Sequence, residues 1–90
     1  MSGFKFTEHD IAVLRVLLKQ GDKWLTGFAI EKAVRHTGRV TDVGLVEASL
    51  RNLRPASYIE NQRVIGEPFL HYRVRPSQRE IVRIELGNLS

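Results

Sequence analysis

Apolar residues recur at helical spacing near the start of the chain, after a residue that can cap a helix. Thr7 offers a hydroxyl, and the acidic residues after it a carboxylate, to the free backbone N–H groups of a helix start. The apolar positions on one face are then Ile11, Leu14 and Leu18, with Leu17 beside them. This spacing predicts a helix over residues 8–20, stopped by Gly21. Val13 and Val16 widen its apolar arc, so we expect a second buried surface.

Two more helices are predicted before the first proline. Thr26 can cap a helix with the sequence GFAIEKAVRHTG, which Gly38 ends. Either Thr41 or Asp42 caps a third helix over residues 42–54, whose apolar side chains are spaced 3, 4 and 3 apart and form one inward stripe. This stripe consists of Val43, Val46, Leu50 and Leu53.

Pro55 marks the boundary between the helical half of the chain and a segment with a period of two. A proline stops the third helix inside the sequence LRNLRPASYIE. Residues 58–64 are rich in strand formers, and apolar and polar side chains alternate over residues 69–75. The two runs predict a two-stranded hairpin over residues 58–75, with its tip at residues 65–68.

A short amphipathic segment follows the hairpin. Ser77 with Glu80 has the spacing of a second capping box. The sequence IVRIEL fits a helix, with Ile81, Ile84 and Leu89 on its apolar side, and it equally fits an alternating third strand. We favour the helix, which gives the order helix, short strand, helix, helix, hairpin, helix.

The bulk composition is that of one globular domain. Ninety residues are enough for a single modest core, and 42% are hydrophobic and 27% charged. No apolar run is long enough to span a bilayer, and the first ten residues do not have the pattern of a secretory signal. Cysteine is absent, which excludes disulfides. We therefore expect one cytoplasmic domain over residues 1–90, with no membrane association.

Positive charge is concentrated in the second half of the chain. The net charge is +4, and residues 35–83 contain nine arginines, five acidic residues and no lysine. The planar guanidinium of arginine suits phosphate and guanine better than lysine does, so this bias favours a nucleic-acid partner. A solvated arginine-rich surface explains the composition equally well.

Several motifs, in order, resemble the winged helix-turn-helix superfamily of PadR-type and MarR-type transcriptional regulators. LTGFAIEKAVRHTG is similar to their second-helix segment, VGLVEASLRNLRPASYIE to their recognition helix and its exit, and FLHYRVRPSQREIV to the second wing strand and the helix after it. The resemblance implies an α+β fold with a three-helix core, a two-stranded wing and a C-terminal helix. Ser57 replaces the family's exit glycine, so we expect an exit shaped differently from a left-handed cap.

The resemblance also implies a small, sequence-specific regulator of transcription that binds double-stranded DNA, with repression favoured. Helix 42–54 would enter the major groove, and the wing over residues 58–75 would lie on the flanking backbone or minor groove. If the apolar stripe faces the core, then Gly44, Glu47, Ala48, Arg51 and Arg54 face out. The full set of expected DNA contacts is Thr26, Arg39, Thr41, Gly44, Glu47, Ala48, Arg51, Arg54, Asn61, Arg63, His71 and Arg73.

No pattern in the chain supports catalysis or metal binding. His9, His36 and His71 lie far apart without the spacing of a metal site. The chain also has no nucleophile elbow and no glycine-rich loop after a strand. We therefore expect neither an enzyme nor a cofactor.

Two hypotheses about partners stay open. A single winged helix covers only a half-site, so we expect a homodimer whose interface contains Val13, Val16, Leu17, Ile81, Ile84 and Leu86. The alternative function is that of a winged-helix module that binds protein and never DNA. The apolar hairpin tip VIGEPF and the acidic Glu47 favour this alternative.

Overall fold

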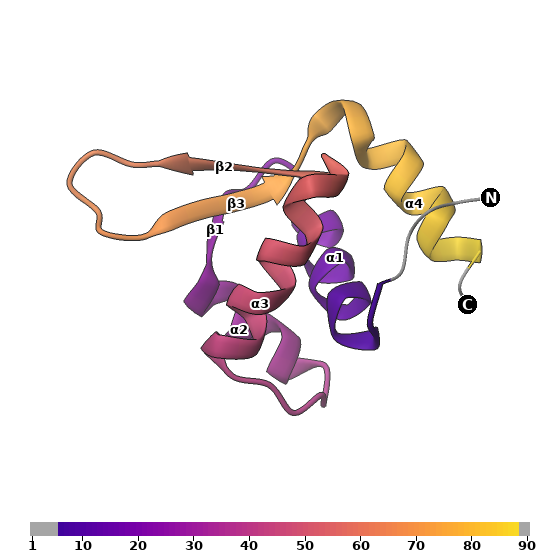
Figure 1. Cartoon of the computed structure of the whole chain (residues 1–90), viewed down its shortest axis with the longest axis horizontal. Helices are drawn as coiled ribbons and strands as arrows, with labels where there is room; N and C mark the ends of the chain where they lie inside the picture. Colours follow the sequence, from indigo (N-terminus) through magenta and orange to yellow (C-terminus); the bar gives the residue numbers. More distant parts are fainter. Residues whose placement is uncertain (1–5, 89–90) are drawn as a thin grey trace.

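A computed structural model of the chain describes residues 6–88 and contains four α-helices, a three-stranded antiparallel sheet and two 3-10 turns (Figure 1). In chain order the elements are α1 (Glu8–Gln20), β1 (Leu25–Thr26), α2 (Gly27–His36), α3 (Val43–Leu53), η1 (Arg54–Ala56), β2 (Ile59–Arg63), β3 (Leu70–Val74), η2 (Pro76–Gln78) and α4 (Arg79–Asn88). The predicted order of elements is confirmed, and the segment after the hairpin is a helix. The predicted apolar position Leu89 lies outside the described residues.

Side-chain caps start the first three helices. The Thr7 hydroxyl accepts a hydrogen bond from the Asp10 backbone N–H, and the Asp10 carboxylate accepts one from the Thr7 N–H, each at 3.1 Å. Thr26 caps α2 by accepting from the Ala29 N–H at 3.2 Å. For α3 the structure selects Asp42, whose carboxylate accepts from the Leu45 N–H at 2.8 Å. The helices therefore begin where short polar side chains replace missing backbone acceptors.

The junction after α3 differs from the prediction. Pro55 lies in the 3-10 turn η1, and Ser57 after it has φ 62° and ψ 14°. These angles are left-handed, so the expectation of a differently shaped exit was wrong. Among the described residues Ser57 is the only residue other than glycine with a positive φ. A serine here adopts a conformation that glycine adopts at lower cost, because the Cβ atom crowds the backbone.

The start of α4 also departs from the predicted capping box. Residues 76–78 form the 3-10 turn η2, and the helix itself begins at Arg79. Ser77 therefore lies inside the turn and does not directly precede the helix. The fixed φ of Pro76 suits the first position of such a turn.

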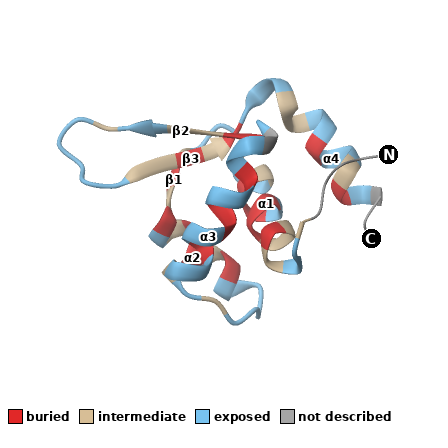
Figure 2. Ribbon diagram, viewed as in Figure 1, coloured by how far each residue is buried: buried red, intermediate tan, exposed pale blue. Residues whose placement is uncertain are grey.

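One apolar core joins all four helices and the sheet (Figure 2). Helix α3 packs on α1 and α2, and α4 packs on a further part of α1. Val82 and Leu86 bring α4 into the same buried cluster as the residues of α1. The expected second buried surface of α1 therefore exists, and a helix of the same chain contributes to it.

This packing corrects part of the predicted dimer interface. Val13 and Leu17 have no exposed surface, and Val16 and Leu86 are 8% and 6% exposed. Their side chains fill the core of their own chain and cannot contact a partner without unfolding it. Ile81 and Ile84, at 45% and 54% exposed, are the members of the predicted interface that lie on the surface.

The sheet has the order β1-β3-β2, with every pair antiparallel. The two residues of β1 pair with β3, Leu25 opposite Tyr72 and Thr26 opposite His71. Strands β2 and β3 form the predicted hairpin, which extends away from the helices as a wing (Figure 1). The strand β1 thus ties the base of the wing to the start of α2.

The packing of α4 predicts unequal effects of two truncations on that helix. Leu86→Ala removes a buried side chain and should lower the free energy of unfolding by about 2–4 kcal/mol. Arg83→Ala, at a position whose side chain is 63% exposed, should change it by less than about 0.5 kcal/mol. Urea unfolding followed by circular dichroism measures both values. Equal losses would contradict the packing of α4 against the core.

Candidate nucleic-acid interface

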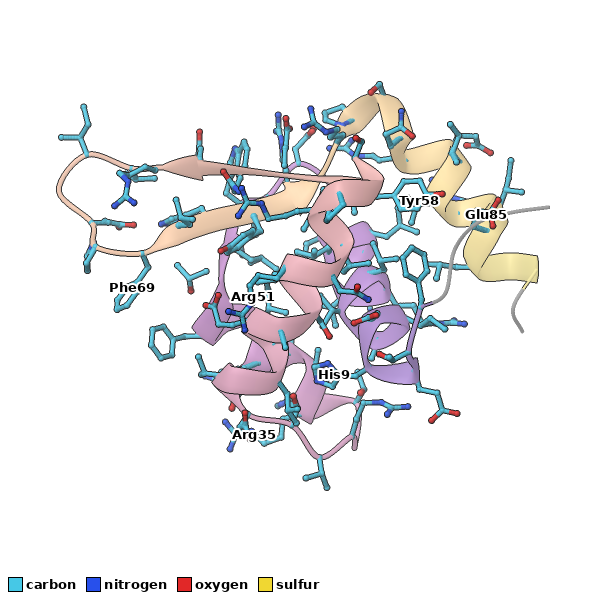
Figure 3. The ribbon with its side chains drawn as sticks, viewed as in Figure 1. His9, Arg35, Arg51, Tyr58, Phe69 and Glu85 are labelled. Carbon is cyan, nitrogen blue, oxygen red and sulfur yellow. The ribbon has the colours of Figure 1, made fainter. Side chains whose placement is uncertain are left out.

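Helix α3 has one buried and one exposed face, as predicted. Val46, Leu50 and Leu53 are 0–1% exposed, and Val43, the first residue of the predicted stripe, is half-buried. The opposite face consists of the exposed residues Gly44, Glu47, Ala48 and Arg51, and it continues to the exposed Arg54, the residue that caps the end of α3. Buried and exposed positions alternate along the helix (Figure 2), and Arg51 lies on the side of α3 from which the wing extends (Figure 3). The outward face is therefore a polar surface with two arginines and two small residues.

Glu47 lies against the start of α2. A Cβ atom built on Gly27 would come within 2.8 Å of the Glu47 Oε1 atom. Gly27, the first residue of α2, is buried under this side chain. The N-terminus of a helix carries partial positive charge, so the carboxylate sits where it is electrostatically favoured.

This placement changes the expected role of Thr26. Thr26 is one of the expected DNA contacts, and a helix start with free backbone donors can bind a phosphate. The Thr26 hydroxyl instead accepts from the Ala29 N–H, and the Glu47 carboxylate adds negative charge beside Gly27. A phosphate at this helix start would be repelled by Glu47 unless that side chain moved.

Tyr72 connects the outward face of α3 to the sheet. Its side chain, on the central strand β3, is 5% exposed. Burial raises the pKa of the Tyr72 phenol above 10.0, the negative charge of Glu47 raises it further, and the positive charge of Arg54 opposes the shift. Glu47 and Arg54 thus lie close enough to the base of the wing to act on the same phenol.

Arg73 is committed to contacts within the chain. Its Nε atom donates to Glu60 Oε2 at 2.7 Å, and its guanidinium lies 4.3 Å from the centre of the Trp24 ring. Asp22 lies 3.7 Å from the Arg73 Nη1 atom and is also hydrogen-bonded by Arg79. The Arg79 hydrogen bond and charge, with a smaller contribution from Arg73, lower the pKa of Asp22 below 3.8.

The other predicted wing residues differ in whether contacts within the chain already occupy their side chains. His71 forms an ion pair or hydrogen bond with Glu67, and Asn61 is half-buried on β2. Arg63 is exposed at the end of β2 and has no ion pair within residues 6–88. Arg63 is therefore the wing cation that can reach a ligand without breaking an internal contact.

Arg39 and Thr41 point to the side of α1. The Arg39 Nη2 atom lies 3.9 Å from Glu8 Oε2, at the start of α1. The Thr41 hydroxyl is 2.6 Å from His9 Nε2. Both residues therefore contact α1, and their role as DNA contacts stays a prediction.

A polar bridge that the sequence did not indicate holds α3 on α1. His9 Nδ1 is 2.7 Å from the Ser49 hydroxyl, and its Nε2 contacts Thr41, so one ring joins α1, α3 and the loop before α3 (Figure 3). Asn52 donates to Asp10 Oδ2 at 2.5 Å. Ser49 and Asp10 are 4% and 2% exposed. Polar residues at positions 9 and 10 gave no sign of partners about 40 residues away.

Two aromatic rings join the start of α2 to the wing. Phe28 and Phe69 pack edge to face with ring centres 4.9 Å apart, and each is about half exposed at 51% and 48%. Such pairs are stabilised beyond simple burial. They also leave apolar surface between α2 and β3.

Residues 6–88 contain neither a cluster of potential metal ligands nor a membrane-spanning helix. No group of three or more histidine, cysteine, aspartate or glutamate side chains in this part of the chain is arranged to hold a metal. No helix within it is long and apolar enough to cross a membrane.

Comparisons with known proteins identify the fold. No protein-family model matches the chain, and no curated protein does. Solved structures do match. A PadR family regulator from Clostridium difficile superposes with a TM-score of 0.72 at 17% identity, over 91% of this chain and 86% of that one. A mutant of MepR from S. aureus superposes with a TM-score of 0.73 at 19% identity, over 93% of this chain and 56% of that one.

The ferric uptake regulator of Francisella tularensis, solved with iron, gives a TM-score of 0.70 at 23% identity and covers 82% of this chain. The chain spans 55% of the length of that regulator. The fold is the winged helix-turn-helix of such transcription regulators, as the resemblance implied.

The His9 bridge predicts a measurable coupling between α1 and α3. His9→Ala leaves the buried Ser49 hydroxyl without its partner, so it should lower the free energy of unfolding by about 1–3 kcal/mol. In the Ser49→Ala background the same substitution should cost less by about 1 kcal/mol, because the orphaned hydroxyl is gone. A double-mutant cycle in urea measures the difference. Strict additivity would show that the two side chains do not interact.

Proposed function

We propose that this chain is a small, sequence-specific regulator of transcription that binds double-stranded DNA and acts as a repressor. The observation that carries the proposal is the exposed face of α3, which combines Arg51 and Arg54 with the small residues Gly44 and Ala48. A helix of this kind fits the major groove, where arginine donates two hydrogen bonds to guanine O6 and N7. The small residues let the helix backbone approach the bases.

The wing supports the same orientation. With α3 in the major groove, Arg63 at the far end of β2 lies where it can contact the flanking backbone or minor groove. Arg73 holds the base of the wing against Trp24 and Glu60, and Asn61 and His71 are secondary contacts. Glu47 would accept a bond from a cytosine amino group.

Repression is the simplest result of such binding, because a domain seated on an operator excludes other proteins from it. The proposed place of action is the cytoplasm. We propose no enzymatic activity for the chain.

A homodimer would supply the second half-site that one winged helix lacks. The exposed Ile81 and Ile84 on α4 are the surface that supports it, since the other apolar residues once assigned to an interface are buried. A two-fold axis along α4 would pair this surface with itself.

One observation favours the alternative of a protein-binding winged-helix module. Ile65 at the tip of the wing is fully exposed, and Phe28 and Phe69, which pack on each other, are each about half exposed. Apolar side chains here suit a protein partner better than phosphates.

Substitution of the α3 arginines tests DNA binding. Duplexes are first selected from a random pool with the wild-type protein, and affinity is then measured by fluorescence anisotropy. Arg51→Ala combined with Arg54→Ala should weaken binding roughly 30-fold or more, because each arginine–guanine contact contributes about 1–3 kcal/mol. Lys23→Ala combined with Arg83→Ala removes the same charge elsewhere and should reduce affinity far less.

Salt dependence separates the two functions. DNA binding requires affinity that falls steeply as salt rises, since cations are displaced from phosphates. If the protein does not bind DNA even at low salt, the proposed regulator is contradicted and the protein-binding module is the function that remains. Equal effects of the two double variants would contradict the role of α3 alone.

The dimer is tested by light scattering at micromolar concentration. Wild-type protein should scatter as a dimer, and Ile81→Asp combined with Ile84→Asp should give a folded monomer, because charge on an apolar interface is strongly unfavourable. Arg83→Asp, on the same helix, is the control and should stay dimeric. A wild-type monomer would overturn this part of the proposal.

A further inference from the structure

A groove runs between α1 and α2. Two hollows of about 430 Å³ and 490 Å³ lie side by side along these helices and share Val16, Lys19 and Thr37. The floor of the groove is apolar and made largely of small side chains: Ile11, Ala12, Val16, Ala29 and Ala33. On α1 it extends from residue 8 to residue 19, about 16 Å at 1.5 Å per residue.

The groove lies on the side of α1 that faces away from α3. On α1, the side chains of His9 and Asp10 reach α3. Groove residues of α1 recur at helical spacing on another face of the helix, at 8, 11, 12, 15, 16 and 19. A partner in the groove would therefore leave the outward face of α3 uncovered.

The rim of the groove is basic. Four cationic side chains, Arg15, Lys19, Lys32 and Arg39, surround the apolar floor, with Glu8 as the acidic residue among them. The balance is four positive charges minus one negative, or +3. Arg39 is near Glu8, but Arg15, Lys19 and Lys32 form no ion pair within residues 6–88. Three exposed cations beside an apolar floor are thus left unneutralised.

We propose that this groove docks an amphipathic helix of another protein, with an apolar stripe flanked by aspartate and glutamate. The small alanine side chains of the floor let a helix approach closely. A groove about 16 Å long accepts about three helical turns, so the bound helix would insert apolar side chains at positions i, i+3 or i+4, and i+7. The cationic rim is complementary to flanking carboxylates and steers their approach. Nucleic acid fits less well, because phosphates would lie over apolar floor.

This inference adds a partner to the proposed function and does not depend on it. A helix bound between α1 and α2 and a duplex bound by α3 can occupy the domain together. The groove would therefore recruit a second protein to the DNA to which the domain is bound.

The probe is a fluorescein-labelled peptide of about 18 residues, with leucine on one helical face and glutamate beside it. Fluorescence anisotropy should give saturable binding to the wild-type protein. A peptide with lysine in place of every glutamate should bind at least roughly tenfold more weakly, because it meets like charge at the rim. Amide NMR shifts should move on α1 and α2 and stay unchanged on the outward face of α3.

Charge reversal on the protein supplies a matched pair of variants. Lys19→Glu combined with Lys32→Glu should weaken binding of the acidic peptide by roughly tenfold or more. Lys23→Glu combined with Arg83→Glu makes the same change in net charge outside the groove and should alter affinity less than about twofold. All four positions are exposed, and thermal unfolding checks that each variant is folded.

Several results would overturn the proposal. Equal binding of both peptides, or equal weakening by both pairs of substitutions, would show that the cationic rim does not contribute to recognition. Displacement of the acidic peptide by duplex DNA would place it on the α3 surface. Concentration-dependent shifts of groove amides without peptide would make a second copy of the chain the occupant. Absence of peptide binding would end the inference, whether or not the protein binds DNA.

Discussion

Burial of one face of α3 against α1 is the constraint on which the rest of the structure depends. Val46, Leu50 and Leu53 lose nearly all contact with water there, which fixes the rotation of the helix about its axis. His9 and Asp10 add directional hydrogen bonds to Ser49 and Asn52, which fix its position along α1. Apolar burial alone tolerates small shifts, whereas a buried polar pair does not, because a shift leaves a donor or acceptor unsatisfied. The exposure of Arg51 and Arg54 follows from this arrangement.

The wing depends on a second set of contacts, at its base. Arg73 stacks on Trp24 and pairs with Glu60 directly across the strands, while Asp22 joins Arg73 to Arg79 at the start of α4. These groups are partly exposed, so each ion pair contributes little by itself. Their contribution is to the geometry, because they link the residues just before β1, the hairpin and α4 around one guanidinium. Arg73, which was expected to contact DNA, thus holds the base of the wing.

Local signals in the sequence predicted the helices, the hairpin and the outward face of α3, because periodicity, caps and Pro55 act over a few neighbouring residues. Contacts between distant residues were not predictable: nothing near His9 indicates Ser49, and nothing near Gly27 indicates Glu47. The apolar arc of α1 correctly indicated a second buried surface. A pattern of apolar residues does not tell whether the surface that packs against it belongs to the same chain or to a partner. Val13 and Leu17, which are buried within the chain, were therefore wrongly assigned to a dimer interface.

Glu47 changes how a winged helix of this kind would balance affinity against selectivity. Its carboxylate lies at the start of α2, where a helix N-terminus otherwise attracts phosphate. Contacts with phosphate raise affinity for every sequence, while contacts with base edges raise it for few. A carboxylate at that position would weaken the first kind, and under the proposed function Arg51 and Arg54 would supply the second. DNA recognition by this surface would therefore depend more on the bases under Arg51 and Arg54 than on the backbone beside α2.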